Sequence, residues 1–181
     1  DIEKIKRTDS LAIYYAGACA EQINDLGKAE KYYRKSISIG YKAEGAYVRL
    51  ERMYAEAGQD DKAFEILKEG RAAFPGNQTM ITDEVNVYLK KDQHEQAMGA
   101  LEAAIKGEPN NASLHFALGF VHDRLASKEI EKNPKGGEAY DKHIASAQAS
   151  YTKAVELDGN NFDAVYNLGA LYFNKAVKMQ E

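Results

Sequence analysis

The 181 residues contain little that would support redox, metal or membrane chemistry. The single cysteine, Cys19, excludes a disulfide within this sequence and any multi-cysteine metal site. No stretch approaches the roughly 18 uninterrupted apolar residues that a membrane span requires. Lys and Arg number 24 against 28 Asp and Glu, so the net charge of −4 gives no positive field for nonspecific nucleic-acid binding. We therefore expect no cofactor, no metal, no nucleic-acid partner and no membrane insertion.

Catalytic signatures are also missing. The sequence has no GxxxxGK[ST] phosphate loop, no GxGxxG dinucleotide motif, no HExxH zinc motif and no GxSxG nucleophile elbow. Hydrophobic residues make up 44% of the chain and charged residues 29%, which is typical of a folded globular protein. We expect a folded chain that is not an enzyme.

Proline is scarce, and its positions reveal an internal period. Two of the three prolines, Pro75 and Pro109, are each followed by a Gly-Asn or Asn-Asn pair, and the interval between them recurs along the chain. Shifting the sequence by this interval aligns columns of small and large apolar residues, namely Ala29, Ala63 and Ala97; Tyr33, Leu67 and Leu101; Ser36, Gly70 and Ala104; and Tyr54 and Tyr88. Each copy has the periodicity of two amphipathic helices joined by a short connector, which predicts antiparallel packing.

These columns, with the Leu-Gly pairs at 118–119 and 168–169, resemble tetratricopeptide repeats (TPR) of a bacterial multi-repeat type. The resemblance implies an all-α fold, a right-handed α-solenoid of antiparallel helix–turn–helix repeats. We place the repeats at 10–43, 44–77, 78–111 and 112–161, with a partial repeat at 162–181 and the tail of a preceding repeat at 1–9. Departures from the family pattern include Glu51 and Val85 in the glycine column.

The fourth repeat is longer than the others. The interval from Gly119 to Ala147 is more than twice the equivalent interval from Gly17 to Ala29, so the fourth repeat carries an insertion near 126–142. Apolar residues behind the insertion recur at steps of four and three, which favours a helix packed along a partner. We expect two lengthened helices joined at a tip near 133–137, and the alternative is a flexible loop.

Isolated histidine and cysteine side chains have plain interpretations. His115 and His122 occupy columns that hold large residues in other copies, so we expect packed, hydrogen-bonded side chains and no metal site. His94 lies in a connector and is expected to face solvent. Cys19 is expected to be a buried small residue.

The family resemblance implies that the first helices of the repeats line a concave groove, into which the residues flanking the Leu-Gly column point. Aromatic side chains there would supply contact area, arginine would pair with carboxylates and asparagine would bind backbone amides. The candidate groove residues are Tyr14, Arg49, Arg52, Asn86, Phe116, Phe120, Tyr166 and Asn167, with Asp83 as a further candidate. Alternatively, Phe116 and Phe120 pack between neighbouring repeats.

The resemblance therefore implies a noncatalytic scaffold that binds a peptide or protein segment in this groove. The cationic positions of the family's carboxylate clamp hold residues such as Thr79 and Asp83, which disfavours an adaptor for chaperone tails. One alternative is a structural module that self-associates weakly through uncapped ends, and another is the targeting arm of a larger enzyme. We expect a soluble protein of the bacterial cytoplasm or periplasm.

Overall fold

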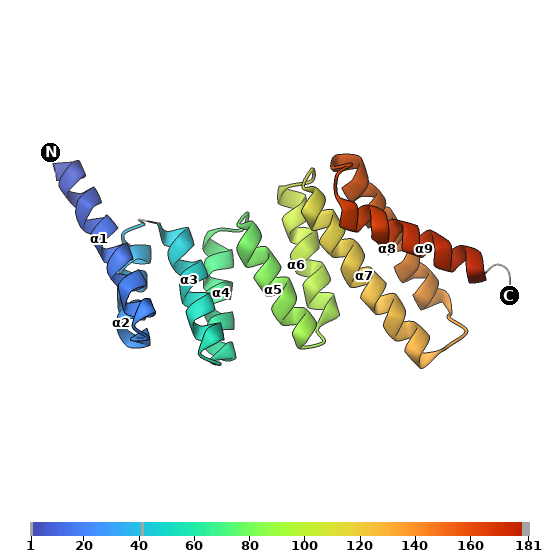
Figure 1. Ribbon diagram of the computed structural model, residues 1–181, viewed down its shortest axis with the longest axis horizontal. Helices are drawn as coiled ribbons and strands as arrows, with labels where there is room; N and C mark the ends of the chain where they lie inside the picture. Colours follow the sequence, from blue (N-terminus) through green and yellow to red (C-terminus); the bar gives the residue numbers. More distant parts are fainter. Residues whose placement is uncertain (1, 41, 179–181) are drawn as a thin grey trace. The chain divides into compact units, whose positions relative to one another are not determined.

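The computed structural model describes residues 2–40 and 42–178, and side chains within residues 10–40 and 42–174 (Figure 1). All regular structure in these described ranges is helical, which confirms the all-α prediction. The helices are α1 (Ile2–Gln22), α2 (Leu26–Ser38), α3 (Ala43–Glu56), α4 (Asp60–Ala73), α5 (Gln78–Lys90), α6 (His94–Gly107), α7 (Ala112–Lys132), α8 (Glu138–Leu157) and α9 (Phe162–Lys178).

Several pairs of consecutive helices pack as hairpins. The pairs α1 with α2, α3 with α4 and α7 with α8 are in close contact, and α2 with α3, α6 with α7 and α8 with α9 contact in turn. This arrangement confirms the expected antiparallel helix–turn–helix repeats. The chain divides into two compact units, Asp1–Val87 and Tyr88–Glu181.

Short polar and glycine motifs set the helix ends. The Asp25 side chain accepts a hydrogen bond from the Lys28 amide at the start of α2, and the Asn111 side chain accepts from the Ser113 and Leu114 amides at the start of α7. Gly58 follows α3 with φ of 70°, a left-handed conformation that glycine adopts without steric cost. These caps supply hydrogen-bond partners for backbone groups that the helix ends leave open.

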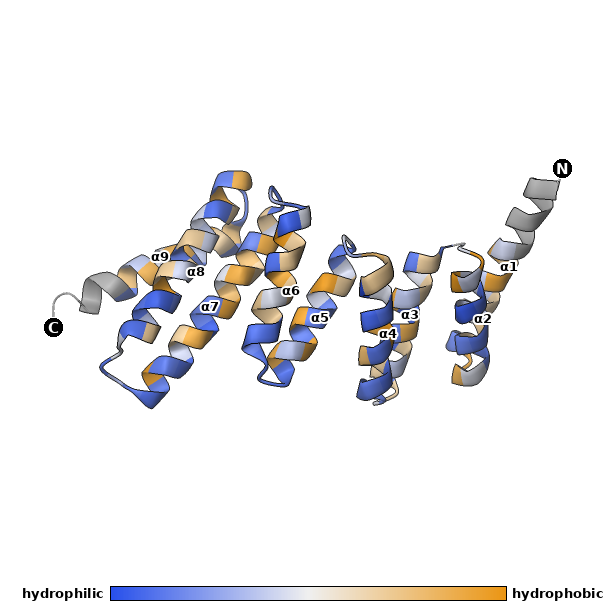
Figure 2. Cartoon of the chain, turned by 180° about the vertical axis from the view of Figure 1, so that it is seen from behind, coloured by the Kyte–Doolittle hydropathy of each residue, from blue (hydrophilic) through white to orange (hydrophobic). Residues whose placement is uncertain are grey.

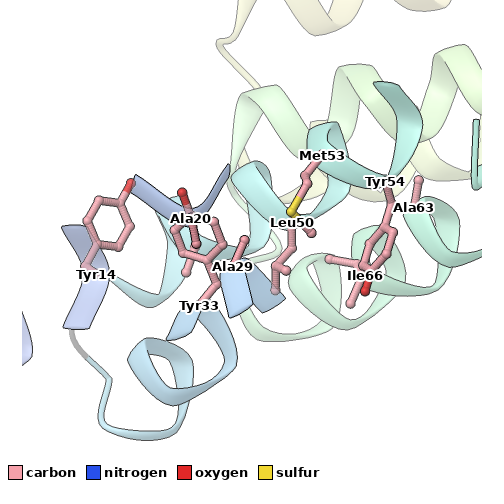
Figure 3. Close-up of a cluster of buried hydrophobic side chains, with 10 residues drawn as sticks. Tyr14, Ala20, Ala29, Tyr33, Leu50, Met53, Tyr54, Ala63 and Ile66 are labelled. Atoms are coloured by element: carbon pink, nitrogen blue, oxygen red, sulfur yellow. The ribbon is translucent and has the colours of Figure 1, made fainter. Parts of the chain in front are cut away.

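The aligned columns form the core of the first unit (Figure 3). Ala29 and Tyr33 of α2 are fully buried, as are Leu50 of α3 and Ile66 of α4. A Cβ atom at Gly17 of α1 would lie 2.9 Å from Tyr33 ring atoms, so a glycine is required for α1 to approach α2 this closely. The Tyr33 hydroxyl donates a 2.5 Å hydrogen bond to Glu21 Oε2, which satisfies the polar end of this buried ring.

The second unit repeats this arrangement between α7 and α8. Ala147, Tyr151 and Ala154 of α8 are fully buried. A Cβ atom at Gly119 of α7 would lie 2.6 Å from the Tyr151 ring. The glycine, alanine and tyrosine columns therefore report the contact between the two helices of a hairpin.

Two lengthened helices form the insertion in the fourth repeat. α7 has 21 residues and α8 has 20, against 14 in α6. The turn between them begins at Asn133, the residue after α7, and Gly136 takes a left-handed φ of 76°. Lys128 of α7 forms an ion pair with Asp92 in the turn before α6, so α7 continues past that end of α6. The insertion is therefore a helical hairpin and not a flexible loop.

The N-terminal segment differs from expectation. Residues 2–9 continue α1 without interruption to Gln22, so they extend the first helix of the first hairpin. They do not form the end of a separate preceding helix, as the prediction for residues 1–9 required. Residue 1 lies outside the described residues.

Candidate functional site

The first unit presents arginine and asparagine on its first helices. Arg52 of α3 and Asn86 of α5 are exposed. Arg49 of α3 is half-exposed, and its guanidinium lies 3.3 Å from Glu21 Oε2. Burial raises the pKa of the Asp83 carboxyl, while the positive charge of Arg52 lowers it. Each arginine therefore already faces one carboxylate, and the surface is mixed in charge.

Tyr14 does not belong to this exposed surface. It is only 9% exposed, and its ring packs edge-on against Tyr33 with centroids 5.7 Å apart. A Cβ atom at Gly45 would lie 3.3 Å from the Tyr14 hydroxyl, which shows how closely α3 passes over it. Because α2 and α3 both cover this ring, Tyr14 is a core residue, and the expectation that it lines an open groove is wrong.

In the second unit, the two phenylalanines of α7 have different environments. Phe116 is partly buried, and its ring centroid lies 5.7 Å from that of Tyr151. Phe120 is exposed, with the Arg124 guanidinium 5.9 Å from its ring centroid. Phe116 therefore packs against the second helix of its own hairpin, whereas Phe120 remains on the surface. Arg124 is a neighbour that the sequence analysis missed, although its spacing of four residues from Phe120 predicts contact on a helix.

Tyr166 and Asn167 of α9 are adjacent in sequence but differ in exposure. Tyr166 is 76% exposed, whereas Asn167 is partly buried. Burial raises the pKa of the Tyr151 hydroxyl, and Asn167 lowers it, so the Asn167 amide lies near that hydroxyl. Within the described residues the Tyr151 hydroxyl has no hydrogen bond of good geometry. Asn167 is thus directed toward the core of the second unit and not toward open surface.

Three exposed residues share one repeat position. Arg52, Asn86 and Phe120 follow one another at the repeat interval, on α3, α5 and α7. All three are exposed. Phe120 belongs to the second unit, so we call Arg52 and Asn86 of the first unit the exposed column; both have the exposure that a binding surface needs.

The histidines show one confirmed and one wrong expectation. His115 is partly buried with its Nε2 2.8 Å from the Pro109 carbonyl oxygen, and His122 is partly buried with its Nδ1 3.2 Å from Nδ1 of His143. The expected packed, hydrogen-bonded state is confirmed for both. His94, expected to face solvent, is 3% exposed, because it begins α6 and its Nδ1 turns back to within 3.1 Å of the Asp92 carbonyl oxygen.

The one cysteine and the possible metal ligands of the described residues complete the candidate chemical groups. Cys19 is exposed, so the expectation of a buried small residue is wrong, because this position on α1 faces away from α2. Among the residues whose side chains are described, no group of three or more His, Cys, Asp or Glu side chains could hold a metal ion. None of the helices in the described part of the chain is both long enough and apolar enough to cross a membrane.

Comparison with known proteins matches part of the chain to a family of repeats. Residues 86–125 match the family model described as TPR repeat. The chain contains tetratricopeptide repeats. Interferon-induced protein with tetratricopeptide repeats 2 from Homo sapiens is 25% identical over 130 residues, which is 69% of this TPR chain. The chain spans about a quarter of that human protein, 27% of its length.

Solved structures share the fold at low sequence identity. A crystal structure of MamA protein is similar with a TM-score of 0.64 and 18% identity, covering 94% of this TPR chain and 85% of MamA. The first TPR of Spaghetti (RPAP3), bound to the HSP90 peptide SRMEEVD, is similar with a TM-score of 0.55 and 19% identity. That match covers 74% of this chain and 93% of the other. At these identities the likeness shows the fold alone.

Proposed function

We propose that this TPR chain is a noncatalytic protein-interaction scaffold that binds a peptide segment on the first helices of its repeats. The exposed column carries the proposal, because Arg52 and Asn86 lie on successive first helices of the first unit. A TPR protein of similar fold is bound to a peptide in its solved structure, which supports this class of function.

The side chains of this face suit an extended peptide. An arginine guanidinium presents a planar set of donors that pairs with a carboxylate in two parallel hydrogen bonds. An asparagine amide offers both a donor and an acceptor, so Asn86 can bind the NH and C=O of an extended backbone. Both features recognise peptide chemistry and need no closed pocket.

The carboxylates on the face restrict the choice of peptide. Glu21 lies beside Arg49, and Asp83 interacts with Arg52. A partner carboxylate must compete with these acids, and a polyanionic segment would be repelled by them. We therefore expect a polar peptide with one acidic residue, and not a strongly acidic tail.

The proposal can be tested with a peptide-display library selected on the chain of residues 1–181. The variant Arg49→Ala/Arg52→Ala is expected to weaken binding of the enriched peptides by on the order of 1.5–3 kcal/mol where the charged contacts are desolvated. The matched control is Arg34→Ala, which removes an exposed, ion-paired arginine from the second helix α2. Circular dichroism checks that helicity is retained.

Two results would overturn the proposal. Enriched peptides that bind the double variant as tightly as the original chain would remove these arginines from the site. Binding of a single-stranded RNA oligomer, abolished by the same double variant, would assign the face to nucleic acid and contradict the expectation drawn from net charge.

A further inference from the structure

Each unit contains a buried tyrosine whose polar surroundings can be compared position by position. The compared residues hold the same places relative to the glycine and alanine columns. They lie on α1, α2 and α3 in the first unit and on α7, α8 and α9 in the second. The corresponding pairs are Glu21 and Asp123, Tyr33 and Tyr151, and Arg49 and Asn167.

In the first unit these side chains form a closed polar network. The Tyr33 hydroxyl donates a hydrogen bond of 2.5 Å to Glu21 Oε2. The Arg49 guanidinium donates to both oxygens of the same carboxylate, at 3.5 Å to Oε1 and 3.3 Å to Oε2. The buried hydroxyl, the carboxylate and the cation therefore each have a partner of complementary chemistry.

In the second unit the same network is incomplete. Asp123 is one methylene shorter than Glu21, and Asn167 has a neutral amide where Arg49 has a cation. The Tyr151 hydroxyl is buried without a hydrogen bond of good geometry to the described residues. The partly buried Asp123 carboxylate likewise has no hydrogen bond and no ion pair within the described part of the chain.

The polar groups of the second unit act on one another. Burial raises the pKa of the Asp123 carboxyl, and no charged group among the described residues opposes this shift. Burial also raises the pKa of the Tyr151 hydroxyl; the charge of Asp123 raises it further, and Asn167 lowers it. Arg124 is adjacent in sequence, but its guanidinium lies 5.9 Å from the centroid of the Phe120 ring. A cation brought to Asp123 would therefore meet a carboxylate that has no counter-ion.

The acceptors around Asp123 favour a guanidinium group over other cations. The oxygens of a carboxylate, an amide and a hydroxyl can all accept hydrogen bonds, and a guanidinium has five donors and no acceptor. Its flat surface also stacks on aromatic rings, whereas an ammonium group is compact and strongly hydrated. Phe116 and Phe120 supply such rings on the same helix as Asp123. Arg49 shows that a guanidinium from this repeat position reaches a carboxylate of the neighbouring first helix.

Exposed aromatic side chains beside the site indicate that the guanidinium belongs to a polypeptide. Phe120 lies three residues before Asp123, on the same face of α7, and is 39% exposed. Tyr166 precedes Asn167 and is 76% exposed. In Figure 2, α7 shows hydrophobic orange interrupted by hydrophilic blue, so apolar and polar side chains alternate along this helix. Such aromatic rings can contact the residues next to a bound arginine, which a free guanidinium compound does not have.

We propose that Asp123, Tyr151 and Asn167 form a site for the guanidinium group of an arginine residue in a partner polypeptide. The Asp123 carboxylate pairs with the cation, and the hydroxyl oxygen of Tyr151 and the amide oxygen of Asn167 accept further hydrogen bonds. The site lies within the second unit, so it does not depend on peptide binding by the exposed column of the first unit.

The probe is an acetylated and amidated pentapeptide with an arginine between two pairs of alanines. An NMR titration of the isotope-labelled chain of residues 1–181 measures its affinity. Asp123→Asn removes the charge at nearly constant size and is expected to weaken binding about tenfold or more. Asp141→Asn neutralises an exposed acid of α8, so it is the matched control and is expected to leave binding unchanged.

Asn167→Arg provides a second variant with an independent mechanism. Its guanidinium is expected to occupy the site, as Arg49 occupies the equivalent place in the first unit, and to weaken binding of the peptide about tenfold or more. Asn110→Arg adds the same charge at an exposed turn of the second unit and is expected to keep most of the affinity. Circular dichroism checks that all four variants retain their helicity.

Three related ligands test the chemistry of the site. A peptide with citrulline, the uncharged analogue of arginine, is expected to bind about tenfold more weakly or less. A peptide with lysine is expected to bind more weakly than the arginine peptide, because it lacks the planar set of donors. Agmatine, a free guanidinium compound, is expected to bind more weakly than the arginine peptide, because it has no neighbouring residues to contact the aromatic rings.

Four outcomes would overturn the proposal. The first is no binding of the arginine peptide at about 10 mM. The second is unchanged affinity in Asp123→Asn and Asn167→Arg, which would place the peptide elsewhere. The third is equal affinity for the lysine and arginine peptides, which would remove the preference for a guanidinium. The fourth is agmatine binding as tightly as the arginine peptide, which would assign the site to a small molecule and not to a polypeptide.

Discussion

Helices α7 and α9 have the same Leu-Gly pair preceded by an aromatic residue, yet the helix surface around this pair is buried in α7 and exposed in α9. In α7 the glycine lies against the ring of Tyr151, and Phe116 packs beside it. In α9 the glycine meets open space and Tyr166 is exposed. The difference is the second helix: α8 covers α7, and no described helix covers α9 in this way. The repeat pattern therefore predicts which face of a helix is suited to packing, but it does not predict whether another helix covers that face.

The sharpest test of this contrast is Gly119→Ala. The new methyl group would lie 2.6 Å from Cδ1 of Tyr151, a ring that is fully buried and cannot move aside freely. Overpacking of this kind destabilises a protein by about 1–3 kcal/mol. Urea unfolding followed by circular dichroism measures the effect.

Gly17→Ala supplies a parallel case, since its methyl group would lie 2.9 Å from Tyr33. If the unfolding midpoint of Gly119→Ala equals that of the unaltered chain, α8 does not press on α7 as the structure describes.

The sequence alone predicted the hairpins because their packing repeats. The columns containing Ala29, Tyr33 and Tyr151 become the buried contacts of the structure, since one geometric requirement recurs in each repeat. The two long helices around the insertion followed from the same register. These contacts recur at the repeat interval, so the periodicity of the sequence reveals them.

Single-position exposures were harder to predict. Tyr14 was expected on an open face, but α2 and α3 cover it. His94 was expected in solvent, but its side chain is buried, with Nδ1 3.1 Å from the Asp92 carbonyl oxygen. The pairing of His122 with His143 joins residues 21 positions apart across the insertion. No repeat column contains this pair, so the period gives no signal for it.

The pair formed by His122 of α7 and His143 of α8 allows a second test, which measures how stability depends on pH. Burial lowers the pKa of His122, and the charge of His143 lowers it further; burial also lowers the pKa of His143. Glu102 opposes the shift at His122 and Glu129 opposes it at His143. The folded chain therefore favours the neutral form of both imidazoles over the protonated form.

The sign follows from proton uptake. When the folded pKa lies below the unfolded value of about 6.5, the unfolded chain binds more protons between the two values. The contribution of the two histidines to stability is then fully present above about pH 6.5, and it decreases as the pH falls from that value toward the folded pKa. Melting temperatures between about pH 7.5 and about pH 5 measure this loss, which we expect to be smaller than the effect of Gly119→Ala.

His143→Gln tests the assignment, because a glutamine does not titrate in this range. The pH dependence is expected to flatten in this variant. His115→Gln, which replaces the partly buried histidine beside the Pro109 carbonyl, is the matched control and is expected to keep the slope. An unchanged slope in His143→Gln would show that the histidine pair does not govern stability.

The smallest expected effect has the opposite sign and completes the comparison. Gly169→Ala places a methyl group where nothing lies within 4 Å, and alanine restricts the unfolded chain more than glycine does. The variant is expected to gain about 0.5–1 kcal/mol at most, the usual advantage of alanine over glycine within a helix. Urea unfolding under the conditions used for Gly119→Ala gives the direct difference between the two positions. A destabilised Gly169→Ala chain would mean that a close neighbour covers α9 in solution, and the same loss at both glycines would remove the distinction between the covered and the open helix.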